Sequence, residues 1–198
     1  DPGDDPEGMK ALRGDVERDL GLGLRFCAFS VRVGVEALAR RRLRMGLERI
    51  LLPVHYWRFP VFPALSRELD PTPGDCILDI GSPKLPSVYF VLKRGAKVYA
   101  TDLQDDRIFE WPACLKALER RRACADRYIV EKQDARQLTY PDGFFDKVYS
   151  ISVLEHIPED GDSLAMREIE RVLKRGGRAF IQVPFRRSYE EVYVTRDV

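Results

Sequence analysis

Three aspartates occupy positions from which carboxylates could bind a nucleoside. Asp79 lies at the end of a short apolar run, Asp102 comes 23 residues later after a second run, and Asp134 follows a third. If these runs are parallel strands, their carboxyl ends meet at one edge of a sheet. A carboxylate after the second strand can accept hydrogen bonds from both ribose hydroxyls, and a short polar side chain after the third can meet an adenine amino group. The spacing therefore predicts a nucleoside-binding edge.

The chain has two histidines, and both are candidates for chemistry. His156 follows a fourth apolar run, and an imidazole, with an ordinary pKa of about 6.5, can act as a general base near neutrality. Glu155 is a weaker candidate for that role. The alternative is that this segment begins a loop and caps nearby helices. His55 stands beside Tyr56 and Trp57 and is a candidate substrate contact.

Short apolar strands alternate with helical segments after the turn cluster Pro71–Asp75. The expected strands are 76–80, 97–101, 128–132, 147–151 and 178–183, and the expected helices are 86–94, 105–125 and 161–175. Asp160 or Asp162 can cap the last helix, and Gly176–Gly177 should stop it. This alternation predicts an α/β fold: a Rossmann-like, doubly wound, mostly parallel sheet with helices on both faces.

Length and composition exclude several classes of protein. A chain of 198 residues with 44% hydrophobic content fits one globular domain with a small appendage, and excludes a disordered tail or a collagen-like repeat. It has no uninterrupted apolar run of about 18 residues, so no membrane span is expected. The net charge of +1 argues against nucleic acid as a partner. Four separated cysteines without a CxxC pair argue against a metal site and favour reduced thiols in the cytoplasm.

The region before the turn cluster has a different character. Residues 1–9 carry four acids and no base and are expected to be a flexible leader, and residues 10–70 an N-terminal helical extension or lid. Residues 10–60 hold eleven Lys and Arg against five acids, a local balance of +6. An Arg-rich helix is expected where Ala39, Leu43, Leu47, Ile50 and Leu51 fall at helical spacing among Arg40, Arg41, Arg42, Arg44 and Arg49. The pattern favours packing of that apolar stripe on the domain, and the alternative is a grip on phosphate or an anionic membrane surface.

Four stretches of the sequence are similar to the class I S-adenosylmethionine-dependent methyltransferases of the small-molecule type. They are CILDIGS, VYATDL, KQDARQLTYPDGFFDKVYSISVLEHIPEDGD and EIERVLKRGGRAFIQVPF, which together span about residues 76–185. The resemblance implies S-adenosyl-L-methionine as cofactor and a small-molecule acceptor. By position, it implies that Asp79, Gly81 and Ser82 face the methionine part, Asp102 and Leu103 the ribose, Asp134 and Ala135 the adenine, and that Ser150 borders the methyl-transfer pocket.

The first loop departs from the family's pattern, which usually reads Asp-x-Gly-x-Gly-x-Gly. Pro83 and Leu85 stand where the second and third glycines normally are. Proline fixes φ near −65° and lacks an N–H group, so the loop must follow another path. Ser82 and Lys84 are expected to supply polar contacts in place of the glycines. An altered loop that no longer binds cofactor is the alternative.

The chain is short for this family after the fifth strand. Only residues 184–198 follow, whereas the family's sheet normally continues with a helix and an antiparallel hairpin. A short strand over 189–195 is expected, and the domain over 71–198 is expected to be incomplete at its C-terminus, with the hairpin truncated. An open sheet edge would remain, and it could pair with a second copy in a homodimer.

The predicted function is S-adenosylmethionine-dependent methyl transfer to a small-molecule or natural-product-like acceptor. Two alternatives remain open. One is a non-catalytic module of the same fold that binds cofactor or a partner, and the other is an RNA-directed methyltransferase that uses the Arg-rich helix.

Overall fold

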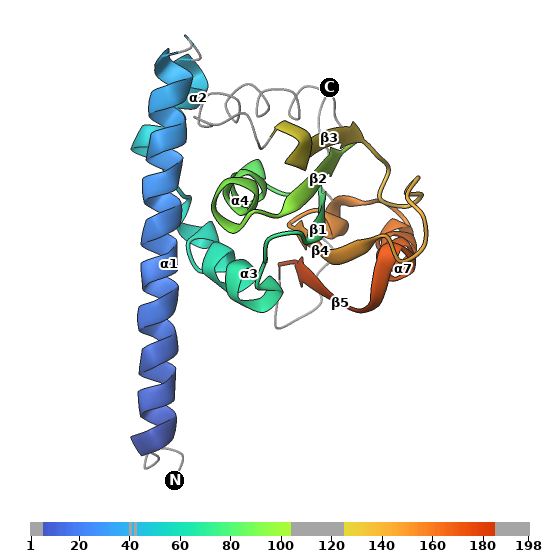
Figure 1. The fold of residues 1–198 in the computed structure, drawn as a ribbon, viewed down its shortest axis with the longest axis horizontal. Coiled ribbons are helices and arrows are strands. Elements are labelled where there is room, and N and C mark those ends of the chain that lie inside the picture. The colour runs from blue at the N-terminus through green and yellow to red at the C-terminus, as the bar shows by residue number, and fades with distance from the viewer. Residues whose placement is uncertain (1–5, 40, 42, 104–124, 185–198) are drawn as a thin grey trace.

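The computed structural model describes residues 6–39, 41, 43–103 and 125–184 (Figure 1). Its centre is a five-stranded sheet in the order β3-β2-β1-β4-β5, and every neighbouring pair is parallel. The strands are β1 (Cys76–Ile80), β2 (Lys97–Asp102), β3 (Tyr128–Lys132), β4 (Phe145–Ile151) and β5 (Leu173–Gln182). The strand order reverses beside β1, as the expected doubly wound α/β fold requires.

The strand predictions are accurate for β1 and β3, whereas β4 and β5 begin earlier than expected. Leu173 pairs with Phe145, and the register then shifts at a bulge before Lys147. Pairing of Leu173 ends the preceding helix, α7 (Gly161–Val172), three residues before its predicted end. Gly176–Gly177 consequently lies inside β5, where the prediction of a helix stop at these glycines is wrong. Asp160 occupies the N-cap position of α7 without a capping side-chain hydrogen bond.

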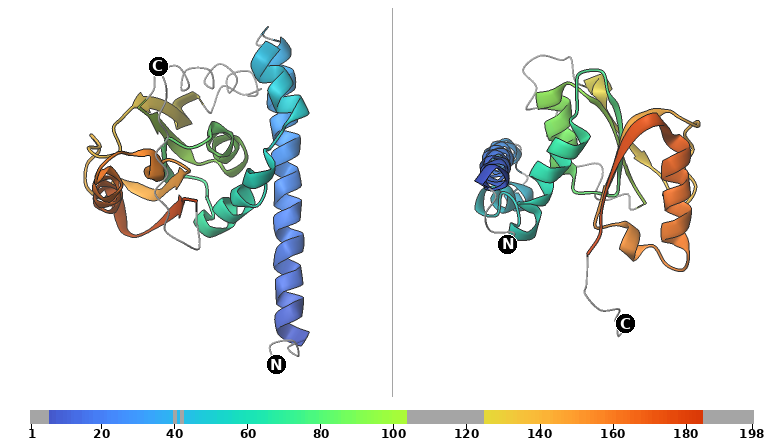
Figure 2. Two further views of the ribbon diagram at one scale, coloured as in Figure 1. Left: turned by 180° about the vertical axis from the view of Figure 1, so that it is seen from behind. Right: turned by 90° about the horizontal axis from the view of Figure 1, so that it is seen from below.

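Helices cover both faces of the sheet (Figure 2). One face carries α3 (Val61–Leu69), α4 (Lys84–Tyr89) and the π-helical turn η2 (Phe90–Arg94), and the other face carries α7. The alternation of side chains along β1 explains this layering, because Ile77 points into one hydrophobic cluster and Leu78 into the other. Ile169 of α7 belongs to the second cluster.

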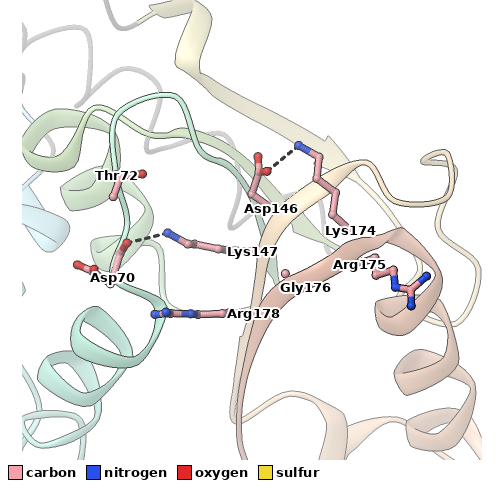
Figure 3. Close-up of a pocket in the computed structure, with 9 residues that line it drawn as sticks. Asp70, Thr72, Asp146, Lys147, Lys174, Arg175, Gly176 and Arg178 are labelled. Carbon is pink, nitrogen blue, oxygen red and sulfur yellow. Dashed lines mark hydrogen bonds and ion pairs between the residues drawn. The ribbon is translucent and has the colours of Figure 1, made fainter.

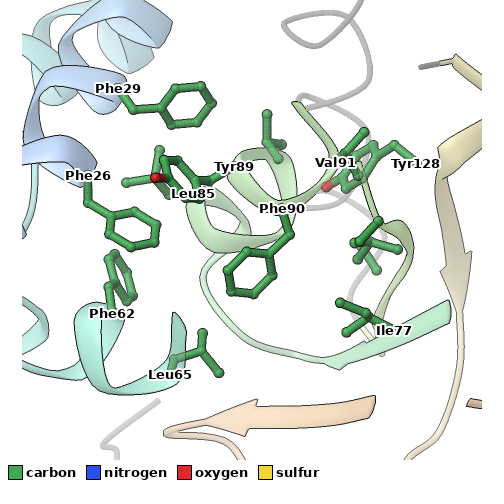
Figure 4. Packing of buried hydrophobic residues seen from close by; sticks show 14 of the residues in the cluster. Phe26, Phe29, Phe62, Leu65, Ile77, Leu85, Tyr89, Phe90, Val91 and Tyr128 are labelled. Carbon is green, nitrogen blue, oxygen red and sulfur yellow. The ribbon is translucent and has the colours of Figure 1, made fainter. Parts of the chain in front are cut away.

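The first cluster also contains the N-terminal helices (Figure 4). Phe26 and Phe29 of α1 (Pro6–Ala39) place their rings 4.4 Å and 5.4 Å from that of Tyr89, and Phe62 of α3 lies 5.4 Å from Phe26. The N-terminal helices and the sheet therefore share one core. Because α1 begins at Pro6, a residue suited to the first turn of a helix, residues 6–9 are helical rather than part of a flexible leader.

The Arg-rich segment packs differently from the prediction. α1 ends at Ala39, the backbone turns at Arg41 with φ of 59°, and α2 (Leu43–Leu51) runs back along α1. The buried residues of α2 are Met45 and Gly46. Of the predicted packing residues, Ile50 is half-buried and lies against Gly34 of α1, whereas Leu43, Leu47 and Leu51 are 64%, 51% and 72% exposed. The two helices approach closely at glycines, since a Cβ atom on Gly46 would lie 3.0 Å from the Gly34 carbonyl oxygen. This close approach selects the glycine face of α2 and leaves the leucine stripe outside.

Some expectations fall on residues that the structure does not describe. These are the helix over 105–125 apart from its last residue, the strand over 189–195, and Arg40 and Arg42. Among the described residues, no helix is both long enough and apolar enough to cross a bilayer.

Candidate functional site

The carboxyl ends of β1, β2 and β4 meet at one edge of the sheet, as the positions of the polar residues predict. Ile80 of β1 pairs with Thr101 of β2 on one side and with Ser150 of β4 on the other. The Gly81 amide donates a hydrogen bond to the Thr101 carbonyl over 2.9 Å, which extends the pairing one residue into the loop. Asp102 follows Thr101 immediately, so the first loop lies next to the residue that is predicted to bind the ribose.

Gly81 begins the loop in a conformation that favours glycine. Its φ is +62°, and an added Cβ atom would lie 2.9 Å from Cγ1 of Val153. Both the backbone angle and the space therefore select against a side chain. The first glycine of the family's loop is thus retained for a structural reason, although the later two are replaced.

Lys84 turns into the protein and takes part in a buried ion pair. Its Nζ lies 3.3 Å from Oδ2 of Asp79 and 3.1 Å from the Thr101 carbonyl oxygen. The Lys84 side chain is 5% exposed and that of Asp79 is fully buried. The ammonium group joins the end of β1 to the end of β2, and a contact of Lys84 with a cofactor stays a prediction.

Asp79 has further partners on its interior side. The Ser82 amide donates to Oδ1 over 3.1 Å, and the Ser87 hydroxyl donates to Oδ2. Ser87 in turn shares a 2.5 Å hydrogen bond with the Tyr149 hydroxyl. Burial raises the pKa of Asp79, and the charge of Lys84 together with these hydrogen bonds opposes the increase. The carboxylate thus shapes the loop from within, and a direct contact with the methionine part stays a prediction.

Ser82 and Ser150 are also buried and link β1 to β4. The Ser82 hydroxyl donates to the Ile80 carbonyl over 3.2 Å and accepts a hydrogen bond from the Ile151 amide over 2.9 Å. The Ser150 hydroxyl donates to the same carbonyl over 3.3 Å. Both side chains therefore hold the strand ends together behind the edge, and their roles at a cofactor pocket remain predictions.

Asp102 and Leu103 occupy a more open position. Asp102 is half-buried at the end of β2, and its carbonyl accepts a hydrogen bond from the Gln133 amide over 3.1 Å. Leu103 is 56% exposed. Asp102 combines a position at the carboxyl edge of the sheet with partial exposure, and it fits contact with a polar ligand.

Asp134 forms a local ion pair next to half-buried Ala135. Its Oδ2 accepts a hydrogen bond from Nη2 of Arg136 over 2.7 Å, and its Oδ1 accepts one from the Arg136 amide over 2.9 Å. The Arg136 guanidinium, followed by that amide, lowers the pKa of Asp134. A ligand that uses this carboxylate has to share it with Arg136.

The two histidines lie at 3₁₀ turns. His156 ends the 3₁₀ turn η4 (Leu154–His156), with its side chain 77% exposed and its Nε2 3.9 Å from Oε1 of Glu155. His55 stacks on Trp57, with ring centroids 4.8 Å apart, just before the 3₁₀ turn η1 (Tyr56–Arg58). The exposed imidazole of His156 retains access to an acceptor, whereas His55 is half-buried, and nothing in the described residues aligns either one with a second catalytic group.

A pocket of about 390 Å³ lies at the opposite, amino edge of the sheet (Figure 3). Its lining comes from the turn before β1 and from the starts of β4 and β5: Asp70, Thr72, Asp146, Lys147, Lys174, Arg175, Gly176, Gly177 and Arg178. Two of its lysines form ion pairs, Lys174 with Asp146 over 2.6 Å and Lys147 with Asp75 over 2.5 Å. In a doubly wound sheet the ligand binds beyond the carboxyl ends. This pocket is therefore separate from the predicted nucleoside site.

Sequence reasoning did not find three of the residues that build the first loop. Thr101, Ser87 and Tyr149 contact Lys84 or Asp79 or extend their hydrogen bonds. One signal in the sequence could have predicted such contacts. Lys84 lies between the positions of the family's glycines and close to Asp79, and a lysine that is buried beside an aspartate needs further hydrogen-bond partners in the interior. Among the described residues no group of three or more His, Cys, Asp or Glu could hold a metal ion.

The geometry of this edge agrees with the comparison with known families. A family model described as "Methyltransferase domain" matches residues 78–181, just over half of the chain. The chain belongs to the class I S-adenosylmethionine-dependent methyltransferases. The matched range runs from within β1 to within β5, and so includes the first loop, Asp102, Asp134 and His156.

Two curated relatives are methyltransferases by name. The chain is 31% identical over 118 residues to methyltransferase GfsG of Streptomyces halstedii, which covers 59% of this chain and 40% of that protein. It is 40% identical over 63 residues to 27-O-demethylrifamycin SV methyltransferase of Amycolatopsis mediterranei (strain S699), which covers 30% of this chain and 22% of that protein. This methyltransferase chain thus spans less than half the length of either relative.

Solved structures share the fold. The [4+2]-cyclase SpnF matches with a TM-score of 0.50 and 24% identity over 59% of this chain and 41% of that one. Geranyl diphosphate C-methyltransferase from Streptomyces coelicolor A3(2), in complex with Mg²⁺, geranyl diphosphate and S-adenosyl-L-homocysteine, matches with a TM-score of 0.52 and 16% identity over 60% of this chain and 42% of that one. At these identities the similarity establishes the Rossmann-like fold of this methyltransferase and nothing about its substrate.

Proposed function

We propose that this chain catalyses S-adenosylmethionine-dependent methyl transfer to a small-molecule, natural-product-like acceptor. Membership of the methyltransferase family supports the reaction class. The relative named as a demethylrifamycin methyltransferase supports an acceptor of the natural-product kind. The acceptor and the methylated atom belong wholly to the proposal, because the match covers 22% of that relative.

One observation carries the proposal: the partly exposed Asp102 carboxylate lies directly beside the glycine turn at Gly81. The Gly81–Thr101 hydrogen bond sets the loop next to the end of β2. Gly81 turns the backbone at a φ of +62° against Val153, and both Gly81 and Asp102 are half-buried. The edge therefore presents a sharp backbone turn next to a carboxylate, which suits a ligand that joins an amino acid to a nucleoside.

In the proposed mechanism the chain binds and orients the reactants. Asp102 accepts hydrogen bonds from the ribose hydroxyls, Asp134 and the Ala135 amide hold the adenine, and the Gly81 turn faces the methionine part. When bound, S-adenosylmethionine supplies a methyl group that its sulfonium has already activated. Alignment of an acceptor with that group can lower the barrier by about 7–11 kcal/mol in the best intramolecular cases. His156 accepts a proton from an acceptor that must lose one.

Titration calorimetry with S-adenosylmethionine and S-adenosylhomocysteine tests the proposal. We expect binding of both, and a weakening of about 5- to 150-fold in Asp102→Ala, equivalent to loss of charge-assisted hydrogen bonds worth about 1–3 kcal/mol. Asp126→Ala, an exposed change in the turn before β3 at the amino edge, is the matched control and should bind normally. No binding of either compound at near-millimolar concentration would overturn the proposal.

A non-catalytic module is the second candidate, and the occupied carboxylates favour it. Asp79 is neutralised by Lys84 and Asp134 by Arg136, so fewer groups are open to a ligand than the sequence predicts. Such a module would bind S-adenosylhomocysteine without methylating any acceptor. Mass spectrometry of natural-product acceptors incubated with chain and cofactor separates the two, because transfer adds one methyl group.

The RNA-directed alternative rests on exposed arginines. Arg41 and Arg44 are exposed at the α1–α2 turn. Reversal of charge at both residues should abolish a salt-sensitive association with RNA if this alternative holds. No association at low salt would exclude it.

A location in the cytoplasm belongs to the same proposal. Cys27 and Cys76 are free in the structure, and a reducing compartment would keep them so. Fractionation of cells that produce the full-length protein tests this.

A further inference from the structure

α1 has two apolar faces. The first packs on the core through Phe26, Phe29, Val33 and Ala37, and the second is in contact with α2 around Gly34 and is exposed over much of its remaining length. The second face, here called the α1 stripe, consists of Val16, Leu20, Leu24, Cys27, Val31 and Val35. At about 100° per residue, these six positions fall within an arc of about 100°. Its members Val16, Leu20, Leu24 and Val35 are 51–60% exposed. A row of exposed apolar side chains along one face of a helix is typical of a surface that packs on a partner.

A second exposed stripe lies on the helix that packs beside α1. Leu43, Leu47 and Leu51, here called the α2 stripe, follow one another at intervals of four and are 51–72% exposed. α2 packs antiparallel on the C-terminal half of α1, where Gly34 meets Gly46. The N-terminal half of α1 extends beyond the sheet and its helices (Figures 1 and 2). The N-terminal half of α1 therefore carries exposed apolar residues, and the C-terminal half of α1 lies beside the exposed leucines of the α2 stripe.

The spacing of the α1 stripe is the same in both directions. Its intervals are 4, 4, 3, 4 and 4 residues, which read identically from either end. A twofold axis midway between Leu24 and Cys27 would bring Val16 against Val35 of the partner subunit and Leu20 against Val31 of the partner subunit. We propose that this chain forms a homodimer through antiparallel packing of two α1 stripes, with the N-terminal half of each α1 beside the α2 stripe of the other copy.

The charges favour the antiparallel arrangement. Exposed Asp15 and Glu17 lie near the N-terminal end of the stripe, where Arg18 pairs with Asp15 over 3.3 Å. Exposed Arg32 and Arg41 lie near its C-terminal end and on the turn that follows, and exposed Arg44 lies in the first turn of α2. Antiparallel packing brings the acids of one copy toward the arginines of the other, whereas parallel packing would bring arginines together.

The exposed area is sufficient for a stable pair. The α1 and α2 stripes present seven side chains that are each at least half exposed. They amount to on the order of 700 Å² per copy, so the pair would bury about 1,400 Å², within the range of about 1,200–2,000 Å² for specific interfaces. The occupant that fits best is a second copy, because its own stripe supplies matched length, spacing and charge.

Light scattering coupled to size exclusion tests the interface with the 198-residue chain. We expect a mass of twice 22.8 kDa at micromolar concentrations. Leu20→Lys combined with Leu24→Lys changes only exposed positions and should yield a monomer with an unchanged thermal unfolding curve. Leu164→Lys, at a side chain 43% exposed on α7, is the matched control and should remain dimeric.

Disulfide cross-linking tests the orientation. Leu20→Cys combined with Val31→Cys should give a covalent dimer on oxidation, beyond that of the unsubstituted chain. Leu20→Cys alone should not, since the two Leu20 positions of an antiparallel pair are about 16 Å apart along the axis.

Four results would overturn the proposal. They are a monomer at all concentrations, a dimer that survives the double lysine change because it forms through a sheet edge, a cross-link from Leu20→Cys alone beyond that of the unsubstituted chain, and a monomer that instead binds phosphatidylserine vesicles through the same leucines. Each outcome is independent of cofactor binding, so the proposal stands or falls separately from the catalytic one.

Discussion

Replacement of Lys84 by Met should destabilise this protein strongly, because it leaves the Asp79 carboxylate buried without its cation. The Lys84 ammonium lies 3.3 Å from that carboxylate, and both side chains are almost wholly buried. Removal of one partner from a buried pair costs about 3–5 kcal/mol. For a chain of this size the loss corresponds to a fall in melting temperature of about 6–20 °C, at about 2–4 °C per kcal/mol. Met keeps most of the volume of Lys, so lost packing contributes little.

The cost should depend on pH in a defined direction. Burial raises the pKa of Asp79, and the charge of Lys84 holds that increase back. Without Lys84 the folded-state pKa rises further above the unfolded value of about 3.9, so the folded state binds a proton that the unfolded state releases. Folding stability therefore falls as pH rises from about 4 through the raised pKa. The cost of Lys84→Met should therefore be smaller near pH 5 than near pH 8.

Urea unfolding followed by circular dichroism at both pH values measures this cost. Lys174→Met is the matched control, because Lys174 forms a 2.6 Å ion pair with Asp146 at the surface and its side chain is 46% exposed. Surface pairs contribute about 0–1 kcal/mol. Adding Asp79→Asn to Lys84→Met removes the charge and should recover much of the stability and abolish the pH dependence. The reasoning fails if Lys84→Met costs no more than Lys174→Met, or if its cost is equal at the two pH values.

Three further changes have expected outcomes. Gly81→Ala should lower the free energy of unfolding by about 1–2 kcal/mol in the same assay, because φ is +62° and the new Cβ would meet Val153; an unchanged midpoint would mean that the loop relaxes freely. Burial raises the pKa of Asp75, but hydrogen bonds from Lys147 and Thr72 outweigh burial and lower it. That stabilisation is present above the unfolded pKa of about 3.9 and is lost as pH falls below it. The difference in free energy of unfolding between Lys147→Met and the unsubstituted chain should therefore shrink in an acid titration from about pH 5 to pH 2. A difference that stays constant would contradict the role of the pair. Arg171→Leu should lower the free energy of unfolding by about 1–3 kcal/mol, because the Arg171 guanidinium donates to two backbone carbonyls in the β3–β4 connection at 2.8 Å and 2.9 Å. Thermal unfolding measures this loss of stability, and a loss smaller than that of Arg167→Leu at an exposed position would refute the expectation.

The strands of the sheet could be located from the sequence because continuous apolar runs reflect burial on both faces. The runs that became β1 and β3 gave the observed bounds, and the carboxyl edge followed from their parallel pairing. The start of β5 could not be located, since it depends on pairing between Leu173 and Phe145 across a bulge. Pairing partners distant in the chain override a local helix signal.

The sequence by itself determined the α/β class and the placement of three aspartates at the strand ends, because both follow from local patterns of burial and turn residues, and it indicated the family through four stretches that resemble its members. Only the tertiary structure decided what those carboxylates face. Lys84 turns inward because Asp79 and the Thr101 carbonyl, from two different strands, converge on one buried point. In the same way, helical spacing predicts that the leucines of α2 share one face, but the contact between Gly34 and Gly46 leaves that face exposed to solvent. Periodicity shows which residues share a face, whereas the direction of that face depends on which surfaces can approach most closely.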